Sequence, residues 1–492
     1  MKKTSLLTIL ILVFFNSCIN KSEQYHPKEI IIAGRIINYN KDSGKNILTI
    51  YINDNSRATQ LNYPAEIDSV GNFHVKFKRY YTQDVMLSYL TNFQVIVHPG
   101  DSLYVVFDGS PNKRTEIYKT VKYSGSSAEL NDNLAIYLEE YFKTRPATSL
   151  IRQKQKLLFP NEYKKFQDSI KLSRKIYQKQ FIKKYKPGKE LKNWINANIE
   201  LSYFDELFNY PDYEKYKDYP KDWHVDYFNF VSNIPPLTIE TLIYADSRWF
   251  INQYLNNYLI PRIFNFGGTL KVDNIDSLIF KKIVELTPTE GLLKQLTLTE
   301  YTNTYLKKYK LSLFEENRNL INEIITESFL IDPINEHYNE IKAFIEKPMP
   351  AADFELNHFE DKTASDIWVK ILSDGKGKVL YIDCWGTWCG ACLNEIPNAI
   401  QMLNNYKDKE VEFVYLCFRS DEKQWKTILT QHKLEGKHYL LNEEQGAYFQ
   451  QLLGISGYPT YVIIDKKGKI IRIGSSFRPF SEETRNIIND LL

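Results

Sequence analysis

The sequence predicts a multidomain protein with an N-terminal antiparallel β-sandwich, an α-helical middle region and a C-terminal α/β domain. Short β-branched and aromatic runs, separated by turn residues, occupy residues 29–125. Apolar residues recur at helical spacing across residues 126–347. Within residues 348–492, an apolar β-prone run stops at a Cys-x-x-Cys turn, and a helical pattern follows. The chain of 492 residues is long enough for about three domains.

The start of the chain has the features of a secretion signal over residues 1–17. Two lysines precede an apolar run at residues 6–15, which is too short to span a membrane and has the length of a signal core. The run leads into Asn16-Ser17-Cys18, which resembles the lipobox of bacterial lipoproteins. This resemblance implies cleavage before Cys18, lipidation of its thiol and a polar tether over residues 18–28.

The alternative is an ordinary secretory signal, because Phe15 and Asn16 depart from the usual lipobox residues. Ile19 is not the aspartate that retains some lipoproteins at the inner membrane, so we expect an outer-membrane anchor that faces the periplasm. No later segment reaches the ~18–20 apolar residues that a membrane span needs.

Composition excludes several classes of protein. The hydrophobic content of 43% and charged content of 25% are those of a globular protein. The net charge of +3 is too small to indicate a nucleic-acid partner. Five cysteines in an exported chain are too few for a disulfide scaffold. We found no cofactor motif, so no cofactor is expected.

The region 29–125 is expected to form the β-sandwich. It resembles the N-terminal β domain that many exported thioredoxin-like proteins carry, through Asp68-Ser69-Val70-Gly71-Asn72-Phe73 and His98-Pro99-Gly100-Asp101. His74 and His98 are isolated and are expected to face solvent on a strand or turn rather than to bind a ligand. The expected strands cover residues 29–37, 46–52, 72–77, 85–90, 93–98 and 103–107.

The region 126–347 is expected to be helical. It contains no cysteine, and its aromatic residues recur at the spacing of a packed core. We interpret it as a spacer or a module that docks a partner. Expected helices begin near residue 127 and cover about residues 160–186, 191–208, 239–259, 275–286, 290–309 and 312–329.

Cys389 and Cys392 are the strongest chemical signal in the chain. Two thiols two residues apart at a helix start can close a small disulfide ring, and the unpaired N–H groups of the helix favour the thiolate of the first. This arrangement indicates thiol–disulfide exchange. Half of a zinc site has the same spacing, but the chain has no second Cys-x-x-Cys pair, so no metal is expected.

From this motif on, the chain resembles the thioredoxin superfamily, and within it the exported TlpA/ResA-like branch. The resemblance covers residues 348–492. It rests on Pro350-Ala351-Ala352-Asp353-Phe354-Glu355-Leu356, the Trp-Cys-x-x-Cys turn, Glu395-Ile396-Pro397, Gly457-Tyr458-Pro459-Thr460 and a hairpin turn at residues 465–469. Ala391 replaces a proline found in many relatives, which leaves the reduction potential open. Cys384 replaces an aromatic residue, and this changes packing only.

The resemblance implies a role for each residue of the motif. Cys389 is the expected nucleophile and Cys392 the resolving thiol of the redox disulfide. Asp383 and Glu395 match acids that serve as proton carriers, since a carboxyl group in an apolar pocket has a raised pKa. The alternatives are a strand-end cap for Asp383 and a solvated helix residue for Glu395.

The expected substrate-binding residues are Trp388, Tyr458 and Pro459. Pro459 is expected to be cis and to expose the Tyr458 backbone as an edge for an extended substrate chain. Trp385 is expected in the core. Cys384 and Cys417 end two apolar runs that predict neighbouring parallel strands. They are interpreted as buried apolar residues, and a second disulfide between them stays open.

These features predict an exported, lipid-anchored thiol–disulfide oxidoreductase that reduces protein disulfides in the periplasm. Such a reductase must be recharged, which implies a membrane electron donor. One alternative is a thiol peroxidase, although no Pro-x-x-x-Thr-x-x-Cys pattern lies upstream. The other is a non-catalytic surface binding protein in which the β and helical regions act and the thiols are vestigial.

Overall fold

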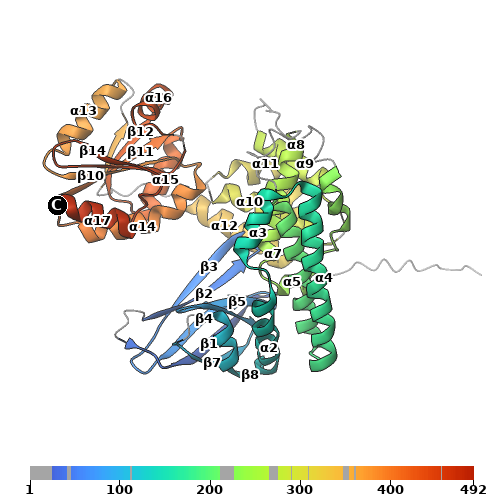
Figure 1. Ribbon diagram of the computed structural model, residues 1–492. Coiled ribbons are helices and arrows are strands. Elements are labelled where there is room, and N and C mark those ends of the chain that lie inside the picture. Colours follow the sequence, from blue (N-terminus) through green and yellow to red (C-terminus); the bar gives the residue numbers. More distant parts are fainter. Residues whose placement is uncertain are drawn as a thin grey trace, which may run out of the picture. The chain divides into compact units, whose positions relative to one another are not determined.

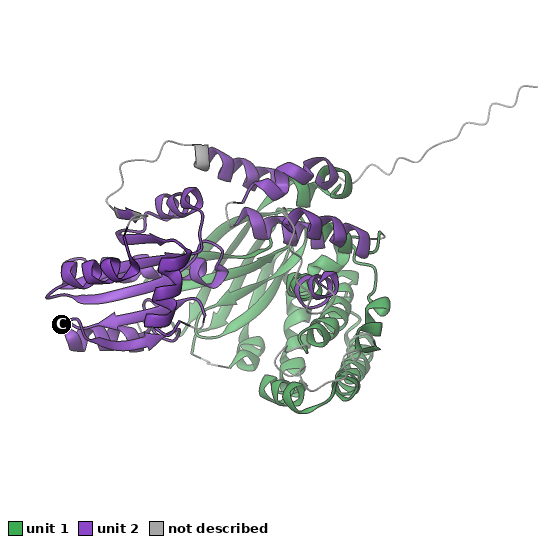
Figure 2. Cartoon of the chain, turned by 90° about the horizontal axis from the view of Figure 1, so that it is seen from above, with its two compact units in different colours: residues 1–254, 288–296, 322–332 green, residues 255–287, 297–321, 333–492 purple. Residues whose placement is uncertain are grey.

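The computed structural model describes residues 25–41, 46–110, 113–210, 226–264, 275–289, 291–307, 310–346, 354–358, 362–455 and 457–492. The signal peptide, Cys18 and most of the tether lie outside these residues. The chain divides into two compact units (Figure 2). Unit 1 comprises residues 1–254, 288–296 and 322–332, and unit 2 comprises residues 255–287, 297–321 and 333–492. The helical middle region therefore contributes to both units.

Two four-stranded sheets form the β region of unit 1 (Figure 1). Their buried faces meet, and the ring centroids of Phe93 and Phe107 lie 5.0 Å apart across the core. The first sheet has the order β4-β1-β7-β8 and the second has the order β3-β2-β5-β6. The strands are β1 (Lys28–Ile37), β2 (Ile47–Asp54), β3 (Thr59–Glu66), β4 (Asn72–Arg79), β5 (Gln83–Ser88), β6 (Asn92–Val97), β7 (Ser102–Asp108) and β8 (Lys122–Gly125).

The expectation of a wholly antiparallel sandwich is wrong for one pair of strands. β1 and β7 are parallel, with Ile32 opposite Leu103. β1 and β7 are far apart in the chain and are not joined by a hairpin, so turn chemistry does not fix their direction. β3 and β8 were not expected from the sequence. β3 is an edge strand of mostly polar residues that contains Pro64, and it lacks the apolar alternation of a half-buried strand.

Side chains of α1 and α2 bond to the backbone of the edge strand β6. The Asn131 side chain of α2 accepts a hydrogen bond from the Ile96 N–H (2.7 Å) and donates one to the Ile96 carbonyl (2.8 Å). The Tyr118 hydroxyl of α1 accepts a hydrogen bond from the Gln94 N–H (2.9 Å). These bonds satisfy backbone groups that an edge strand would otherwise present to other chains.

The helical region agrees with the expected positions in most places. α4, α5 and α9 lie at the expected ranges, whereas the expected helix at 239–259 is a 3-10 helix, a short α-helix and a π-helical turn. The bounds are α1 (Arg114–Thr120), α2 (Ala128–Thr144), α3 (Thr148–Leu157), α4 (Pro160–Tyr185), α5 (Lys189–Phe208), η3 (Phe228–Asn233), η4 (Ile239–Ile243), α7 (Ser247–Gln253), η5 (Tyr254–Leu259), α8 (Ile260–Ile263), α9 (Ile275–Leu286), α10 (Leu293–Leu306), α11 (Ser312–Ile324) and α12 (Ser328–Glu346).

The two histidines singled out in the β region differ in their surroundings. His74 is exposed on β4, as expected. His98 does not simply face solvent, because its Nδ1 lies 2.9 Å from Asp101 and its Nε2 lies 3.0 Å from Glu190 of α5. The turn after β6 is thus linked to Glu190 of α5, which lies 92 residues later in the chain, a pairing that local sequence does not reveal.

The C-terminal region is built on a mixed six-stranded sheet with the order β14-β13-β10-β11-β12-β9. β10 and β11 are parallel neighbours, as expected, and the β13–β14 hairpin is also confirmed. Figure 1 shows α13 and α16 on one face and α14 and α17 on the other. The elements are β9 (Phe354–His358), α13 (Ala364–Asp374), β10 (Val379–Trp385), α14 (Gly390–Tyr406), β11 (Val411–Phe418), α15 (Glu422–His432), β12 (Gly436–Leu441), α16 (Glu443–Leu452), β13 (Thr460–Ile464), β14 (Ile470–Gly474) and α17 (Glu482–Leu491).

Each face of this sheet carries its own hydrophobic core. Cys417 belongs to the cluster beneath α14, α15 and α17, whereas Cys384 belongs to the cluster beneath α13 and α16. Successive strand residues point to opposite faces, which separates these two thiols. Both are buried and free, so they do not form a second disulfide.

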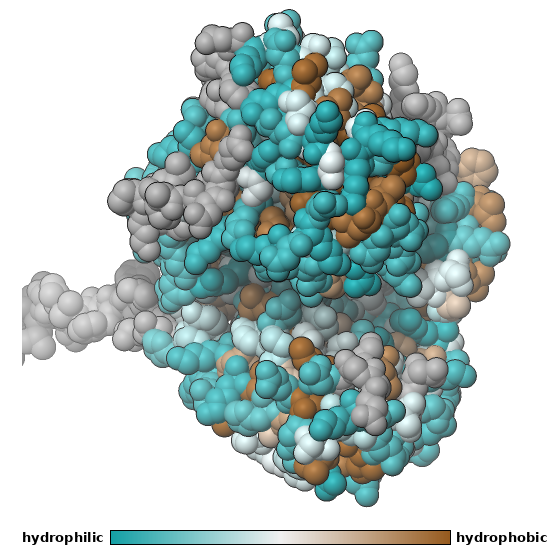
Figure 3. Space-filling model, turned by 90° about the vertical axis from the view of Figure 1, so that its left-hand side faces the viewer, coloured by the Kyte–Doolittle hydropathy of each residue, from teal (hydrophilic) through white to brown (hydrophobic). Residues whose placement is uncertain are grey.

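On the face drawn in Figure 3, hydrophobic side chains occur as separate groups among hydrophilic residues, which is usual for a globular surface. Among the helices that the structure describes, none is long and apolar enough to cross a membrane.

Candidate functional site

A disulfide between Cys389 and Cys392 lies where β10 gives way to α14. β10 is buried along its whole length, so it fixes the position at which the helix starts. Cys389 is the N-cap of α14, and its Sγ accepts a hydrogen bond from the Cys392 N–H (3.2 Å). The first sulfur therefore sits against the unpaired N–H groups of the helix, as the spacing predicts. Both cysteines are buried, with 6% and 4% exposure, so Cys389 is only marginally the more accessible.

The loop before the disulfide is tied to the loop that follows β11. The Thr387 N–H donates to Ser420 Oγ (3.0 Å), and the Trp388 indole N–H donates to the Phe418 carbonyl (2.9 Å). Trp388 packs so closely that a Cβ at Gly386 would lie 2.5 Å from its Nε1. This loop thus needs a glycine at position 386 and holds the Trp388 ring in one orientation.

The expected substrate-binding residues come together beside the disulfide. The Tyr458–Pro459 peptide bond is cis, which confirms the expectation. The ring of Tyr458 meets that of Trp388 edge-on, with centroids 5.2 Å apart. Trp388 and Tyr458 are half-buried and Pro459 is buried. Trp385 is 2% exposed and belongs to the core, also as expected.

Asp383 is a buried carboxyl group in the middle of the sheet. It lies opposite Tyr415 on β11 and Tyr461 on β13, so the three side chains share one face. Burial raises the pKa of Asp383 to about 8, and the charge of Glu395 adds to the rise. Among the described residues, its Oδ1 and the hydroxyls of both tyrosines have no hydrogen-bond partner. Each such orphaned group costs on the order of 1–3 kcal/mol, which marks this as a strained polar position in an apolar core.

Glu395 differs from the expected carboxyl group in an apolar pocket. It is 9% exposed, so it is not a solvated helix residue. Its Oε1 lies 2.5 Å from Arg478 Nη1, and its Oε2 accepts a hydrogen bond from Asn398 Nδ2 (2.9 Å). Both carboxylate oxygens are occupied, and a cation pairs with one of them. An expectation based on the helical turn after Cys392 misses Arg478, because it comes from the chain 83 residues later.

Arg419 is a residue at this site that sequence reasoning missed. It follows the last residue of β11 and has φ of 45°, a left-handed conformation that costs a non-glycine residue about 1–3 kcal/mol. Its guanidinium lies 4.8 Å from the centre of the Trp388 ring and 5.9 Å from that of Tyr458. Nothing in the local sequence signals this contact, which depends on the two loops being joined.

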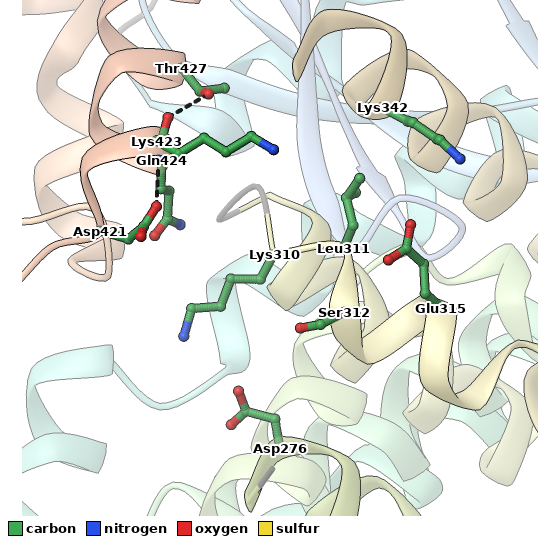
Figure 4. Close-up of a pocket in the computed structure, with 10 residues that line it drawn as sticks. All are labelled: Asp276, Lys310, Leu311, Ser312, Glu315, Lys342, Asp421, Lys423, Gln424 and Thr427. Carbon is green, nitrogen blue, oxygen red and sulfur yellow. Dashed lines mark hydrogen bonds between the residues drawn. The ribbon is translucent and has the colours of Figure 1, made fainter. Parts of the chain in front are cut away.

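A separate pocket of about 510 Å³ occurs elsewhere in unit 2. Figure 4 shows its lining, which mixes lysine with acidic and polar side chains. Two hydrogen bonds are drawn there, both at the start of α15. The Gln424 N–H donates to Asp421, and the Thr427 hydroxyl donates to the Lys423 carbonyl. It has no cysteine and none of the expected site residues, so it offers no group for the disulfide chemistry.

Comparisons with known proteins match the part of the chain that holds the disulfide. The Redoxin family model matches residues 346–491. Thiol-disulfide oxidoreductase ResA of Bacillus thuringiensis is 32% identical over 101 residues, which cover 20% of this chain and 57% of that protein. The chain thus spans little more than half the length of the first curated relatives it matches. Thioredoxin-like protein YneN of Bacillus subtilis is 28% identical over 149 residues, 30% of this chain and 82% of that protein.

One solved structure with a matching segment is that of a putative thiol-disulfide oxidoreductase from Bacteroides vulgatus. The two sequences are 33% identical over the match, which covers 24% of this chain and 77% of that chain, and the TM-score is 0.22. The Redoxin match lies in the C-terminal region and includes both cysteines of the disulfide.

Proposed function

We propose that this chain, whose C-terminal domain belongs to the Redoxin family and is similar to ResA-like thiol–disulfide oxidoreductases, reduces protein disulfides with its Cys389–Cys392 pair. The observation that carries the proposal is the placement of this pair at the N-terminus of α14, in the core cluster on the face of β10 that carries the buried Asp383. A helix start favours the thiolate of Cys389, and the thiolate is the form that attacks disulfides.

The reduced pair would act in two exchange steps. In the first, the Cys389 thiolate attacks one sulfur of the substrate disulfide, forms a mixed disulfide and releases the other substrate sulfur as a thiolate. In the second, Cys392 loses its proton and attacks Cys389 Sγ, which forms the Cys389–Cys392 disulfide and releases the second substrate thiolate. Two electrons pass from the cysteine pair to the substrate, and the released thiolates take protons from water.

Asp383 is the proposed acceptor of the Cys392 proton. Cys392 packs in the same cluster as Tyr381 and Trp385, which flank Asp383 by two positions on the same face of β10. A pKa near 8 is close to the usual thiol value of about 8.5, and a matched pKa makes proton transfer efficient. Glu395, paired with Arg478, is assigned a positioning role through its charge beside Asp383.

The surface formed by Trp388, Tyr458 and Pro459 is proposed to receive an extended segment of the substrate. Half-buried aromatic rings offer apolar contact area that is already ordered, which lowers the cost of binding. An exposed backbone edge beside a redox pair can add hydrogen bonds to any extended chain, so recognition of this kind tolerates many substrates.

The chemistry is tested by insulin reduction together with two single substitutions in the full chain. C389S is expected to abolish turnover, because Cys389 alone has the N-cap position that favours a thiolate, and Cys384 and Cys417 are fully buried. C392S is expected to retain the first step and to accumulate a mixed disulfide, visible by mass spectrometry. Turnover by C389S would refute the nucleophile assignment. Equilibration of the wild-type pair with a glutathione series gives its potential, and a value as oxidising as about −120 mV would overturn the direction of electron flow.

The proposed location is the periplasmic face of the outer membrane, with Cys18 as the lipid anchor and a membrane electron donor that recharges the cysteine pair. Supporting this are the positively charged start, the short apolar run and Cys18 at its end. Metabolic labelling with palmitate tests it. The wild-type chain should carry label and sediment with membranes, whereas C18S should do neither. A labelled C18S variant, or an unlabelled wild-type chain, would refute the proposed lipid anchor at Cys18.

A further inference from the structure

Arg419 is an exposed cation held at the rim of the redox site. Its side chain stacks over Trp388 and faces Tyr458, at 4.8 and 5.9 Å from the ring centres. Burial raises the pKa of Tyr458, and both the charge of Arg419 and a hydrogen bond from its side chain oppose this rise. The guanidinium is therefore close to the two rings that border the disulfide, and stacking limits the orientations it can take.

Its position is fixed by the same contacts that fix the redox loop. The Trp388 indole is bonded to the carbonyl of Phe418, the residue directly before Arg419. The residue directly after it, Ser420, accepts the Thr387 N–H. Arg419 itself adopts a left-handed backbone conformation, so this turn is shaped by its tertiary contacts rather than by local preference.

Arg419 has no carboxylate partner in the part of the chain that the structure describes. The two acids that follow it are engaged elsewhere. Asp421 caps α15 by accepting the Gln424 N–H (2.9 Å), and Glu422 pairs with Lys426 (2.7 Å). No ion pair joins Arg419 to any described acid within 4.0 Å. The Arg419 side chain is exposed, and the N–H donors of its guanidinium that Tyr458 does not engage are suited to a carboxylate of another molecule.

We propose that Arg419 selects substrate segments that carry an acidic side chain beside the reactive half-cystine. This inference rests on the proposed function and adds a substrate class to it. Trp388 and Tyr458 would contact the segment around its cysteine, and Arg419 would pair with the neighbouring carboxylate. An exposed ion pair of this kind is weak, so we expect about a fivefold preference in kcat/KM for an acidic over a neutral neighbour.

The test uses three disulfide-linked fluorogenic peptides that differ only in the residue beside the cysteine, which is Glu, Gln or Lys. The reduced full-length protein is mixed with each, and the rate of disulfide cleavage is measured at low and high NaCl. We expect the order Glu, Gln, Lys from fastest to slowest, with the differences shrinking as salt screens the charges. R419Q should bring the three rates together, and R419K should keep a smaller preference.

Arg485 on α17 provides a matched control. Its guanidinium also stacks on an aromatic ring, that of Phe480 at 4.7 Å, but it makes no contact with Trp388 or Tyr458. R485Q should therefore keep the full preference for the acidic peptide. Circular dichroism establishes that both variants are folded.

Two results would overturn the inference. One is equal rates for the three peptides with the wild-type protein, and the other is a preference that R419Q retains. Failure to cleave any of the three peptides, or insulin, would instead refute the proposed function. The two failures are thus distinguishable.

Discussion

The two acids of the redox site, Asp383 and Glu395, have different surroundings. Burial raises the pKa of Asp383 to about 8, and its Oδ1 has no hydrogen-bond partner among the described residues. Glu395 has a cation and an amide to stabilise its charge. The resemblance to known families implies a proton-carrying role for both acids, but their different contacts indicate different roles. Asp383, whose pKa is raised by burial, can accept and return a proton, and the charge of the neighbouring Glu395 adds to that rise in pKa.

The substitution D383N should therefore slow the resolving step and stabilise the domain. We expect a loss of about 100-fold in the second exchange step at pH 7, the usual effect of removing a positioned base. Rapid-quench measurement of mixed-disulfide decay from pH 6 to pH 9 checks this. The wild-type rate should rise with pH through about 8, and the D383N rate should lack that rise. D408N, at an exposed position of the same domain, should behave as wild type.

The stability effect of D383N has a defined sign. The pKa of Asp383 is about 8 in the folded domain and about 3.9 when unfolded. Between these values the folded state binds the proton more tightly, so wild-type stability falls as pH rises from about 4 to about 8. Asparagine removes this penalty, and D383N should gain on the order of 2 kcal/mol at pH 8 and little at pH 4. Urea unfolding at both values measures it, and equal gains would contradict the assignment.

The residues that could be predicted are those whose chemistry is local in sequence. Cys389 and Cys392 are set by their spacing, and Pro459 by its motif. Arg419 and Arg478 could not be predicted, because each meets its partner across more than 30 residues of intervening chain. The same reason explains why the acids of the site looked alike in the sequence and differ in the structure.

At the scale of elements, segments with a strong hydrophobic periodicity could be predicted from the sequence, whereas an edge strand could not. The run that ends at Cys384 forms β10, and α9 has the bounds expected for it. β3 was missed, because an edge strand faces solvent and has no apolar alternation to detect. The single helix expected at residues 312–329 is wrong, because α11 ends at Ile324 and a separate helix, α12, begins at Ser328. Pro333 lies inside α12, where packing of Phe329, Leu330 and Ile334 in the core outweighs the local preference of proline.

The link between the turn after β6 and α5 should depend on pH through His98. Burial lowers the pKa of His98, but hydrogen bonds to Asp101 and Glu190 outweigh this and raise it. A raised pKa stabilises the fold below the unfolded value of about 6.5, and the contribution is lost as pH rises through the folded value. H98Q should lose roughly 0.5–1 kcal/mol at pH 5.5 and less at pH 8.5, since the pair is partly exposed.

Thermal unfolding of the full chain at the two pH values tests the His98 link. The exposed His74 on β4 provides the comparison, because H74Q changes the same chemical group without such partners. A Tm difference for H98Q that is the same at both pH values would show that packing, rather than charge, supports the link.

Across the whole molecule, buried or half-buried acids with raised pKa values occur in both units. In unit 1, burial raises the pKa of Asp84 to about 7, and the charge of Asp246 adds to the rise. Asp205, in the same unit, also has a pKa raised to about 7, chiefly by burial. Asp383 contributes in unit 2. Stability of the whole chain should therefore decline from mildly acidic to mildly alkaline pH, whichever unit unfolds first.

Asp84 gives the clearest test of this decline. Its Oδ1 accepts the Ala245 N–H (2.6 Å), a bond that asparagine can preserve, while Asp246 is occupied by Asn53 Nδ2 (2.7 Å). D84N removes one of two neighbouring buried charges and should raise the free energy of unfolding by about 2 kcal/mol at pH 8. At pH 4 both forms are neutral, and D84N and the wild type should have the same stability.

Calorimetry at the two pH values measures the difference as a shift in Tm. D226N, an exposed aspartate in unit 1, should shift neither value. A D84N variant less stable than wild type at pH 8 would mean that the carboxylate is held by contacts stronger than the repulsion from Asp246.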